Sequence, residues 1–440
     1  MEKKMRVGIL TLGCKVNQYE SEAIAEALTY KGFSVAPHTE LCDAYIINTC
    51  TVTAESDRKA RQMIRRMITK NPAAYILVTG CYSQVSPEEV AQIEGVDYLC
   101  GSSNKMTVVN KLCSLIEHGK KAEKAEICVP ELDESEFEQM SIRRFDRTRA
   151  YVKIEDGCES RCAYCTIPAS RGPIRSKPFN EVIDEVKTLT ENGVREVVLT
   201  GIETGSYGKD LPEKESFASL LSAIDKIEGI GRVRTGSLDP TVVKPEFVEK
   251  IKDLKSLCPH FHLSLQSGSS KILASMKRKY NADQALACIE RLKAAMPDVK
   301  LTTDVIVGFP GESEEDFLES CEFARKARFL MIHVFPYSKR KGTVAAEMKD
   351  QIPESVKKER VAKLSEISRE IRSEILDEKI AEGKVTDVLF ETFREGYAHG
   401  HTADFIEVKV KTSKRLQGLV RSVKLISHNG EVCEGIFVEQ

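Results

Sequence analysis

The stretch from Gly157 to Cys165, Gly-Cys-Glu-Ser-Arg-Cys-Ala-Tyr-Cys, places three cysteines on one short segment directly after a predicted strand, Tyr151–Ile154. Three thiolates on one loop can hold three irons of a 4Fe–4S cluster, whose fourth iron then stays open for a small molecule. A structural zinc knuckle is the alternative. Zinc sites generally use four ligands in paired spacing, however, and no fourth ligand is near. The segment therefore predicts cluster chemistry.

Around this loop, short apolar runs alternate with helical stretches, which is typical of a series of βα units. The further strands expected are Val197–Thr200, Arg232–Thr235, His262–Leu265, Thr303–Val307 and Ile332–Phe335. Helices are expected at Asn180–Asn192, Asp283–Ala295 and Ser313–Ala327, and a long charged helix at Glu354–Glu382. About six such units predict a partial (β/α) barrel, whose chemistry belongs at the C-terminal ends of its strands.

The segments on either side of this barrel differ from it in pattern. The N-terminal one has apolar runs at Val7–Leu12, Tyr45–Asn48 and Tyr75–Thr79, with helical stretches at Glu20–Tyr30 and Ser56–Thr69. After Gly383, β-rich runs at Val385–Phe390, Phe405–Val410, Gly418–Ile426 and Gly435–Val438 predict a small β-barrel. The fold class is thus α/β, with an N-terminal domain at 1–120, a linker at 121–147, the barrel at 148–375 and a C-terminal domain at 376–440.

Bulk composition narrows the possible function classes. The 440 residues contain 14 cysteines and carry a formal net charge of −2. We expect no membrane span, because no apolar run is long enough, and a cytoplasmic location, because the N-terminus lacks a signal-peptide pattern. In a reducing compartment the cysteines favour metal binding or catalysis over disulfides. The net charge gives no global argument for nucleic-acid binding.

Cys14, Cys50 and Cys81 form a second candidate set, because each comes directly after one of the three N-terminal strands. Ligands of open parallel sheets collect at the C-terminal strand edge, where these thiols would converge. Gly13 and Gly80 would let the backbone bend around an inorganic cluster, and the helices that follow would point positive dipoles at it. Three buried, inert thiols are the alternative interpretation.

The central loop resembles the radical SAM (S-adenosylmethionine) superfamily, in which an aromatic residue, here Tyr164, precedes the last cysteine. The resemblance implies that S-adenosylmethionine binds the open iron and is cleaved to a radical. Cofactor-binding roles are expected for Tyr164, Gly201, Glu203 and Gln266. Glu203 would hold the amino group of S-adenosylmethionine, and an ordinary exposed glutamate is the alternative.

With both cysteine sets, and with Gly13–Ser21 (Gly-Cys-Lys-Val-Asn-Gln-Tyr-Glu-Ser), the whole chain resembles the radical SAM methylthiotransferase family. That resemblance implies a flavodoxin-like N-terminal domain, the radical SAM barrel and a C-terminal TRAM-type β-barrel. It also implies two 4Fe–4S clusters: the one on Cys14, Cys50 and Cys81 carries the sulfur, and the one on Cys158, Cys162 and Cys165 makes the radical. An electron donor such as flavodoxin or ferredoxin and a sulfur source are the expected partners.

The substrate is less sharply indicated. Ala150–Cys158, Ile167–Ser176 and Gly396–Val408 resemble the branch that modifies carbon 2 of N(6)-threonylcarbamoyladenosine next to the tRNA anticodon. A ribosomal-protein aspartate or isopentenyladenosine in tRNA are the alternatives within the family. A non-catalytic RNA-binding protein with metal-stabilised domains is the alternative outside it.

Two clusters of basic residues favour RNA. One follows Cys50 and comprises Arg58, Lys59, Arg61, Arg65 and Arg66; the other comprises Lys409, Lys411, Lys414, Arg415, Arg421 and Lys424. Lys409 and Lys411 would share one face of a strand, giving a basic stripe that can track a phosphate backbone. Either cluster is otherwise an ordinary solvated face. Arg171 or Arg175 is expected to pair the carboxylate of a threonylcarbamoyl group.

Overall fold

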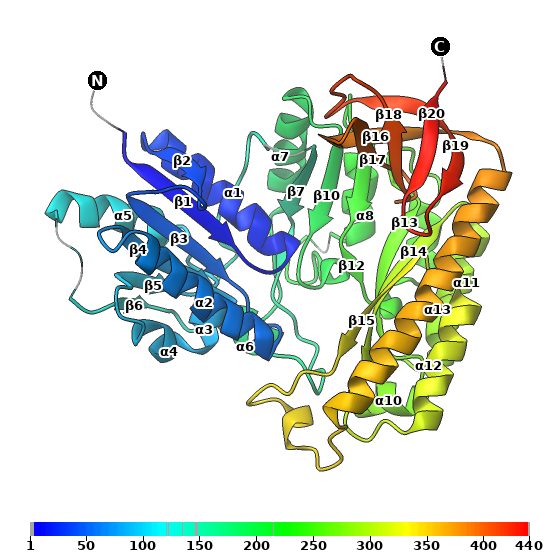
Figure 1. Cartoon of the computed structure of the whole chain (residues 1–440), viewed down its shortest axis with the longest axis horizontal. Helices are drawn as coiled ribbons and strands as arrows, with labels where there is room; N and C mark the ends of the chain where they lie inside the picture. The colour runs from blue at the N-terminus through cyan, green and yellow to red at the C-terminus, as the bar shows by residue number, and fades with distance from the viewer. Residues whose placement is uncertain are drawn as a thin grey trace.

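The N-terminal residues form a six-stranded parallel sheet in the order β2-β1-β3-β4-β5-β6 (Figure 1). This computed structural model describes residues 4–119, 121, 123–133, 135–145, 148–213 and 215–438. The strands are β1 Arg6–Thr11, β2 Ser34–Pro37, β3 Ala44–Thr49, β4 Tyr75–Gly80, β5 Tyr98–Cys100 and β6 Glu126–Cys128. The helices are α1 Lys15–Tyr30, α2 Ala54–Lys70, α3 Cys81–Val85, α4 Pro87–Ala91 and α5 Thr107–His118.

Helices cover both faces of this sheet, which is why its central strands read as unbroken apolar runs. All six residues of β3 are buried. Ile24 of α1 and Leu112 of α5 pack on one face, while Ile64 of α2 and Val90 of α4 pack on the other. The strands that bear Cys14, Cys50 and Cys81 are therefore neighbours, in the order β1-β3-β4.

The middle of the chain forms the expected partial barrel of parallel strands. One part of its wall has the order β11-β10-β7 and the other β12-β13-β14-β15. Its strands are β7 Arg149–Lys153, β10 Glu196–Thr200, β11 Arg232–Thr235, β12 Ser237–Leu238, β13 His260–Gln266, β14 Lys300–Val307 and β15 Met331–Pro336. The larger helices around it are α7 Phe179–Glu191, α8 Phe217–Ile224, α11 Ala282–Ala295, α12 Glu314–Ala327 and α13 Glu354–Ala381. A two-stranded ribbon, β8 Glu155–Asp156 with β9 Arg175–Ser176, and the short helix α6 Ile167–Arg171 flank the cysteine loop.

The C-terminal strands close into a five-stranded barrel, β16-β17-β18-β20-β19. They are β16 Val385–Arg394, β17 Tyr397–Thr402, β18 Glu407–Lys411, β19 Val420–His428 and β20 Cys433–Phe437. The sequence did not predict β17 as a strand. Its inward positions are Ala398, Gly400 and Thr402, which are small or polar, so the usual apolar alternation is missing.

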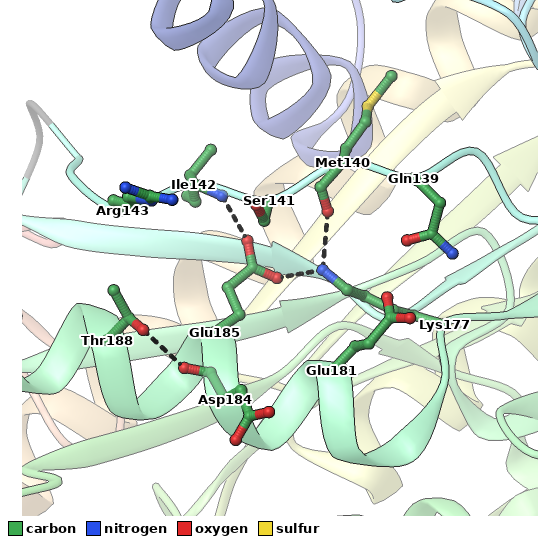
Figure 2. A pocket seen from close by; sticks show the side chains of 10 residues that line it. All are labelled: Gln139, Met140, Ser141, Ile142, Arg143, Lys177, Glu181, Asp184, Glu185 and Thr188. Carbon is green, nitrogen blue, oxygen red and sulfur yellow. Dashed lines mark hydrogen bonds and ion pairs between the residues drawn. The ribbon is translucent and has the colours of Figure 1, made fainter.

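The segment predicted as a linker packs against both neighbouring domains along its described residues. It supplies β6 to the N-terminal sheet, and further on it crosses α7 (Figure 2). There the carboxylate of Glu185 accepts hydrogen bonds from the Ile142 backbone N–H at 2.8 Å and from Lys177 Nζ at 2.6 Å. Tyr19 of α1 donates to the same carboxylate at 2.9 Å. This contact fixes the N-terminal sheet against the central barrel.

Across the described ranges, none of the helices is both long and apolar enough to span a bilayer.

Candidate active site

Cys14, Cys50 and Cys81 converge at the C-terminal edge of the N-terminal sheet. Cys50 and Cys81 directly follow β3 and β4, and Cys14 caps α1 just after β1. Gly13 and Gly80 have φ angles of 99° and 106°, which are open to glycine at little cost. A Cβ on Gly13 would lie 2.7 Å from Cβ of Cys50, and one on Gly80 would collide with the carbonyl of Thr49. The two glycines therefore permit the close approach of the three thiols.

The electrostatics of this set match its geometry. Burial raises the pKa of Cys14, and burial with the neighbouring charges of Cys81 and Cys14 raises that of Cys50 to about 11. Cys14 is reachable by solvent, although burial dominates its pKa shift. Its thiol is thus accessible to solvent and also close enough to Arg171 and Cys81 for their charges to act on it.

Cys158, Cys162 and Cys165 lie on the loop at the C-terminal end of the barrel wall, and every hydrogen bond to the last two sulfurs comes from a nitrogen donor. The Ile167 backbone N–H donates to Cys165 Sγ at 3.4 Å, and Arg278 Nη1 donates to Cys162 Sγ at 3.1 Å. Cys158 Sγ accepts from the Ser160 N–H and lies 3.2 Å from Oε2 of Glu203. Burial raises the pKa of Cys165 to about 11.

Of the predicted cofactor-binding residues, Tyr164 belongs to this loop and Glu203 contacts it. Glu203 touches Cys158, and the Tyr164 ring meets Phe309 edge to face, with centroids 6.5 Å apart. A Cβ on Gly201 would lie 2.6 Å from Oε2 of Glu155, so a larger residue would displace that buried acid. Gln266 ends β13 with a φ of 73°, a conformation that is uncommon for a residue other than glycine and is often found at functional sites.

Arg171 connects the two cysteine sets. It ends α6, six residues after Cys165, and its Nε donates to Cys81 Sγ at 3.1 Å. Its other nitrogens bond to Glu20 at 2.7 Å, Asp156 at 3.0 Å and Asn17 at 2.5 Å. The side chain has no exposed surface. The structure therefore speaks against the expected pairing of Arg171 with a substrate carboxylate, because its guanidinium is already occupied inside the protein.

Arg175 is also buried, 6% exposed, and lies beside Asp156. Nη2 donates to the Arg171 carbonyl at 2.5 Å, whereas Nε and Nη1 are buried without a partner among the described residues. Lys105 and Lys153 complete the ionic network by pairing with Glu20. Burial alone raises the pKa of Glu20, but Arg171, Lys105 and Lys153 together hold it well below its usual value.

Both cysteine sets fit an iron–sulfur cluster better than one metal ion. Tetrahedral zinc brings its sulfur ligands within about 3.8 Å of one another. In the described part of the chain, the one group of three metal-ligating side chains with all ligand atoms within 4.8 Å is His262, Asp304 and His333, which contains no cysteine. The wider cysteine sets suit a larger body, and N–H donors to the sulfurs are a feature that tunes such clusters.

The sequence did not reveal the polar lumen of the barrel, by which we mean the space bounded by the inward-facing residues of its strands. Along β13 the residues Phe261, Leu263 and Leu265 are buried against helices, while His262, Ser264 and Gln266 alternate with them and face the lumen. His262 Nε2 lies 3.3 Å from Oδ2 of Asp304 on β14, and its ring is 5.9 Å from that of His333 on β15. The period-two polar pattern of β13 was the available signal.

Lys15, next to Cys14, is exposed to solvent and lies within electrostatic reach of residues on the barrel strands. Its amine interacts electrostatically with Arg149, Arg234, Glu196 and Asp304, which belong to four barrel strands. Burial lowers its pKa to about 8, with Arg149 and Arg234 adding to the shift.

The C-terminal barrel supplies the floor of the lumen. Phe405 stacks between His260 and His401, with centroids 4.4 Å and 5.0 Å away, and lies beneath the guanidinium of Arg234 at 4.9 Å. Phe405 has a φ of 72°, which is rare for a bulky residue. Phe405 thereby lies at the N-terminal end of the barrel strands, since His260 begins β13 and Arg149, whose guanidinium is 5.7 Å from the ring, begins β7.

The two basic clusters differ in how free their charges are. In the first, Arg58 is paired with Glu55 and Arg61 with Tyr82, while Lys59, Arg65 and Arg66 are exposed. In the second, Lys409 and Lys411 share the outer face of β18, since Val408 and Val410 are buried between them. Lys409 lies over the Tyr397 ring at 5.0 Å. The remaining members, Lys411, Lys414, Arg415, Arg421 and Lys424, are exposed.

Comparison with known proteins agrees with this arrangement. Residues 152–324 match the Radical SAM superfamily, and residues 6–101 match the Uncharacterized protein family UPF0004. The chain is 39% identical to threonylcarbamoyladenosine tRNA methylthiotransferase MtaB of Bacillus subtilis, over 98% of this chain and 96% of that one. It is 37% identical to the protein of that name from Thermotoga maritima, over 98% of both chains. It is 36% identical to tRNA-2-methylthio-N(6)-dimethylallyladenosine synthase of Aquifex aeolicus, also over 98% of both.

Among solved structures, the radical S-adenosylmethionine methyltransferase TsrM from Kitasatospora setae is similar in fold, with a TM-score of 0.58 at 13% identity over 78% of this chain and 74% of that one. Membership of the superfamily implies S-adenosylmethionine and a 4Fe–4S cluster. The identity over nearly the full length of several relatives shows more. This chain belongs to the radical SAM tRNA methylthiotransferase family.

Proposed function

We propose that this chain places a methylthio group on carbon 2 of N(6)-threonylcarbamoyladenosine next to the tRNA anticodon. The observation that carries the proposal is the pair of cysteine sets joined by Arg171, whose backbone follows Cys165 and whose Nε reaches Cys81 Sγ at 3.1 Å. The relatives from Bacillus subtilis and Thermotoga maritima bear the name of this reaction.

In this proposal, Cys158, Cys162 and Cys165 hold one 4Fe–4S cluster and Cys14, Cys50 and Cys81 hold a second. When bound, the first cluster and S-adenosylmethionine supply the radical, and the second cluster supplies the sulfur. The chain's own residues position these groups. Tyr164, Gly201, Glu203 and Gln266 would bind S-adenosylmethionine, and Glu203, 3.2 Å from Cys158, suits its amino group. An electron donor such as flavodoxin or ferredoxin and a cellular sulfur source complete the reaction in the cytoplasm.

The RNA would bind through the exposed lysines and arginines of the C-terminal barrel, with Lys409 and Lys411 on the outer face of β18. A base must leave its stack to reach a buried reaction centre, and enzymes that modify bases pay this cost of a few kcal/mol. Exposed Lys59, Arg65 and Arg66 on α2 extend the positive surface beyond Cys50.

Dimethylallyladenosine in tRNA is the second candidate substrate, because relatives of that name are also 35–36% identical to this chain. The test compares nucleosides of total tRNA from cells that lack the gene and from cells complemented with it. Loss of 2-methylthio-threonylcarbamoyladenosine, with accumulation of its precursor, is the expected result. An unchanged level of this nucleoside overturns the proposal. The other methylthio-adenosine and the ribosomal-protein aspartate would then be measured in the same cells.

A further inference from the structure

The lumen behind the two cysteine sets contains a cation with no counter-ion of its own. Among the described residues, no hydrogen bond or ion pair reaches Nζ of Lys15. By contrast, its cationic neighbours are paired: Arg234 with Glu196 at 2.9 Å, and Arg149 with Glu391 at 3.1 Å. Lys15 is exposed to solvent within this space, so its amine is accessible to an anionic ligand, and none of the described acidic side chains forms an ion pair with it.

The neighbouring side chains suit a polar ligand. Asp304, His262 and His333 come from three adjacent strands and face the lumen beside Lys15. His262 is oriented by Thr302, whose hydroxyl lies 2.9 Å from Nδ1, and it holds Asp304 through Nε2. Asp304 offers a carboxylate acceptor for hydroxyl or N–H groups, and His333 is exposed to the lumen.

A divalent cation at His262, Asp304 and His333 is the competing interpretation, since two histidines and a carboxylate are common metal ligands. The surrounding charge opposes it. Lys15 and Arg372 both act on His333 electrostatically, and Lys15 acts on Asp304, so a metal ion would lie close to fixed positive charges. The same charges favour an anion, which would pair Lys15 and leave Asp304 to accept hydrogen bonds.

The position of Lys15 sets where such an anion would lie relative to the chemistry. Lys15 directly follows Cys14, and Phe405 lies at the N-terminal end of the barrel strands, where it stacks on His260. A base that entered from the mouth would carry its substituent downward, toward the lysine, while its ring stayed level with the cysteines. An apolar substituent would leave Lys15 unpaired, whereas a carboxylate would form an ion pair with it.

We propose that Lys15 binds the carboxylate of the N(6)-threonylcarbamoyl group, with Asp304, held by His262, accepting a hydrogen bond from its hydroxyl or urea N–H. This assignment rests on the proposed function and adds a specificity-determining residue to it. Lys15 is a substrate-recognition residue, and the chain uses it to distinguish an acidic substituent from an apolar one on the same adenine.

The test measures binding and methylthio transfer with the full-length holoenzyme and three anticodon stem-loop RNAs. The RNAs carry threonylcarbamoyladenosine, its methyl ester or dimethylallyladenosine, and otherwise have the same sequence. The wild-type protein is expected to bind the acid about 10- to 100-fold more tightly than the ester, as for a charge-assisted hydrogen bond. Lys15→Gln should bring that ratio close to one, and Lys15→Arg should retain part of it.

Lys31→Gln is the matched control, since Lys31 lies exposed at the other end of the same helix and should not change the ratio. Because Lys15 adjoins Cys14, iron content and the visible spectrum of each variant are recorded first, and Lys15→Arg serves if Lys15→Gln loses iron. Equal binding of acid and ester by the wild-type protein overturns the assignment, as does an unchanged ratio in Lys15→Gln. Zinc bound with micromolar affinity and lost in His333→Asn would replace it with the metal site.

Failure of the proposed function gives a different result. In that case the wild-type protein methylthiolates the dimethylallyl RNA and leaves the threonylcarbamoyl RNA unmodified. If the threonylcarbamoyl RNA is modified but acid and ester are used equally, only the role of Lys15 is rejected.

Discussion

Each of the two cysteine sets brings three thiols together, but the two sets do so by different means. Cys158, Cys162 and Cys165 share one loop, so their spacing alone brings them together. Cys14, Cys50 and Cys81 are far apart in the sequence and meet because β1, β3 and β4 are neighbours in one parallel sheet. The first set depends on local chain geometry, and the second depends on a folded domain. The two should therefore respond differently to changes in ligands, glycines and buried charges.

Removal of each set separately should give the largest effects. With Cys158, Cys162 and Cys165 all changed to alanine, we expect the iron content to fall from about eight to about four per chain, with loss of S-adenosylmethionine cleavage. The same change at Cys14, Cys50 and Cys81 should also halve the iron but leave 5′-deoxyadenosine formation intact and abolish methylthio transfer. Iron analysis and product chromatography check both variants. Retention of methylthio transfer in the second variant would contradict the comparison.

Arg171→Met should be the most destabilising change outside the cysteines. It leaves Glu20 and Asp156 buried with fewer cations, which costs about 3–5 kcal/mol of unfolding free energy. Arg278 is the matched residue of the loop set, since it donates to Cys162 and pairs with Asp239, which is 14% exposed. Because its acid lies nearer to solvent, Arg278→Met should cost less. Thermal unfolding at one scan rate compares the two, and equal losses would refute the ranking.

Glycine substitutions beside each cysteine set should affect iron binding at that set and not at the other. Gly80→Ala puts a methyl group against Thr49 in the left-handed region, and Gly157→Ala does so against Pro173. Gly193 also has a positive φ, 87°, but a Cβ there meets nothing within 4 Å. Gly193→Ala should cost about 1–2 kcal/mol from conformation alone, and the other two should cost more. We expect Gly80→Ala to lose iron at the sheet and Gly157→Ala at the loop, as followed by electron paramagnetic resonance.

The smallest expected effect is a difference in pH response between two buried glutamates. Glu20 has a depressed pKa, so its stabilisation is present above about pH 4.3 and is lost as the pH falls. Burial, with the charges of Asp156 and Glu203, raises the pKa of Glu155, so stability is lost there as the pH rises above about 4.3. Glu20→Gln should therefore lower the unfolding midpoint at pH 7. For Glu155→Gln, the unfolding midpoint relative to that of the wild type should rise between pH 5 and pH 8. A pH-independent difference for Glu155→Gln would contradict this.

Sequence patterns predicted the features that depend on residues close together in the sequence. The strands that bear the cysteines, the glycines beside Cys14 and Cys81, and the partial barrel all follow from local periodicity and spacing. Arg171 shows the limit of such local patterns. Its partners Glu20 and Asn17 are more than 150 residues away, so nothing near Arg171 in the sequence indicated that its guanidinium is bound inside the protein. The lumen was missed for a related reason. His262, Asp304 and His333 are unremarkable one by one, and only the strand register brings them together.

Phe405 has a consequence for how this architecture can be altered. The Phe405 ring, which packs against His260 and Arg234 of the central barrel, belongs to the same small barrel whose outer face carries Lys409 and Lys411. The C-terminal barrel is therefore not structurally independent of the central barrel. Replacing it with a foreign domain, or deleting it, would also remove the Phe405 ring from its contacts with His260 and Arg234. If the proposed RNA-binding role of Lys409 and Lys411 holds, RNA binding and the packing around His260 and Arg234 therefore depend on the same domain.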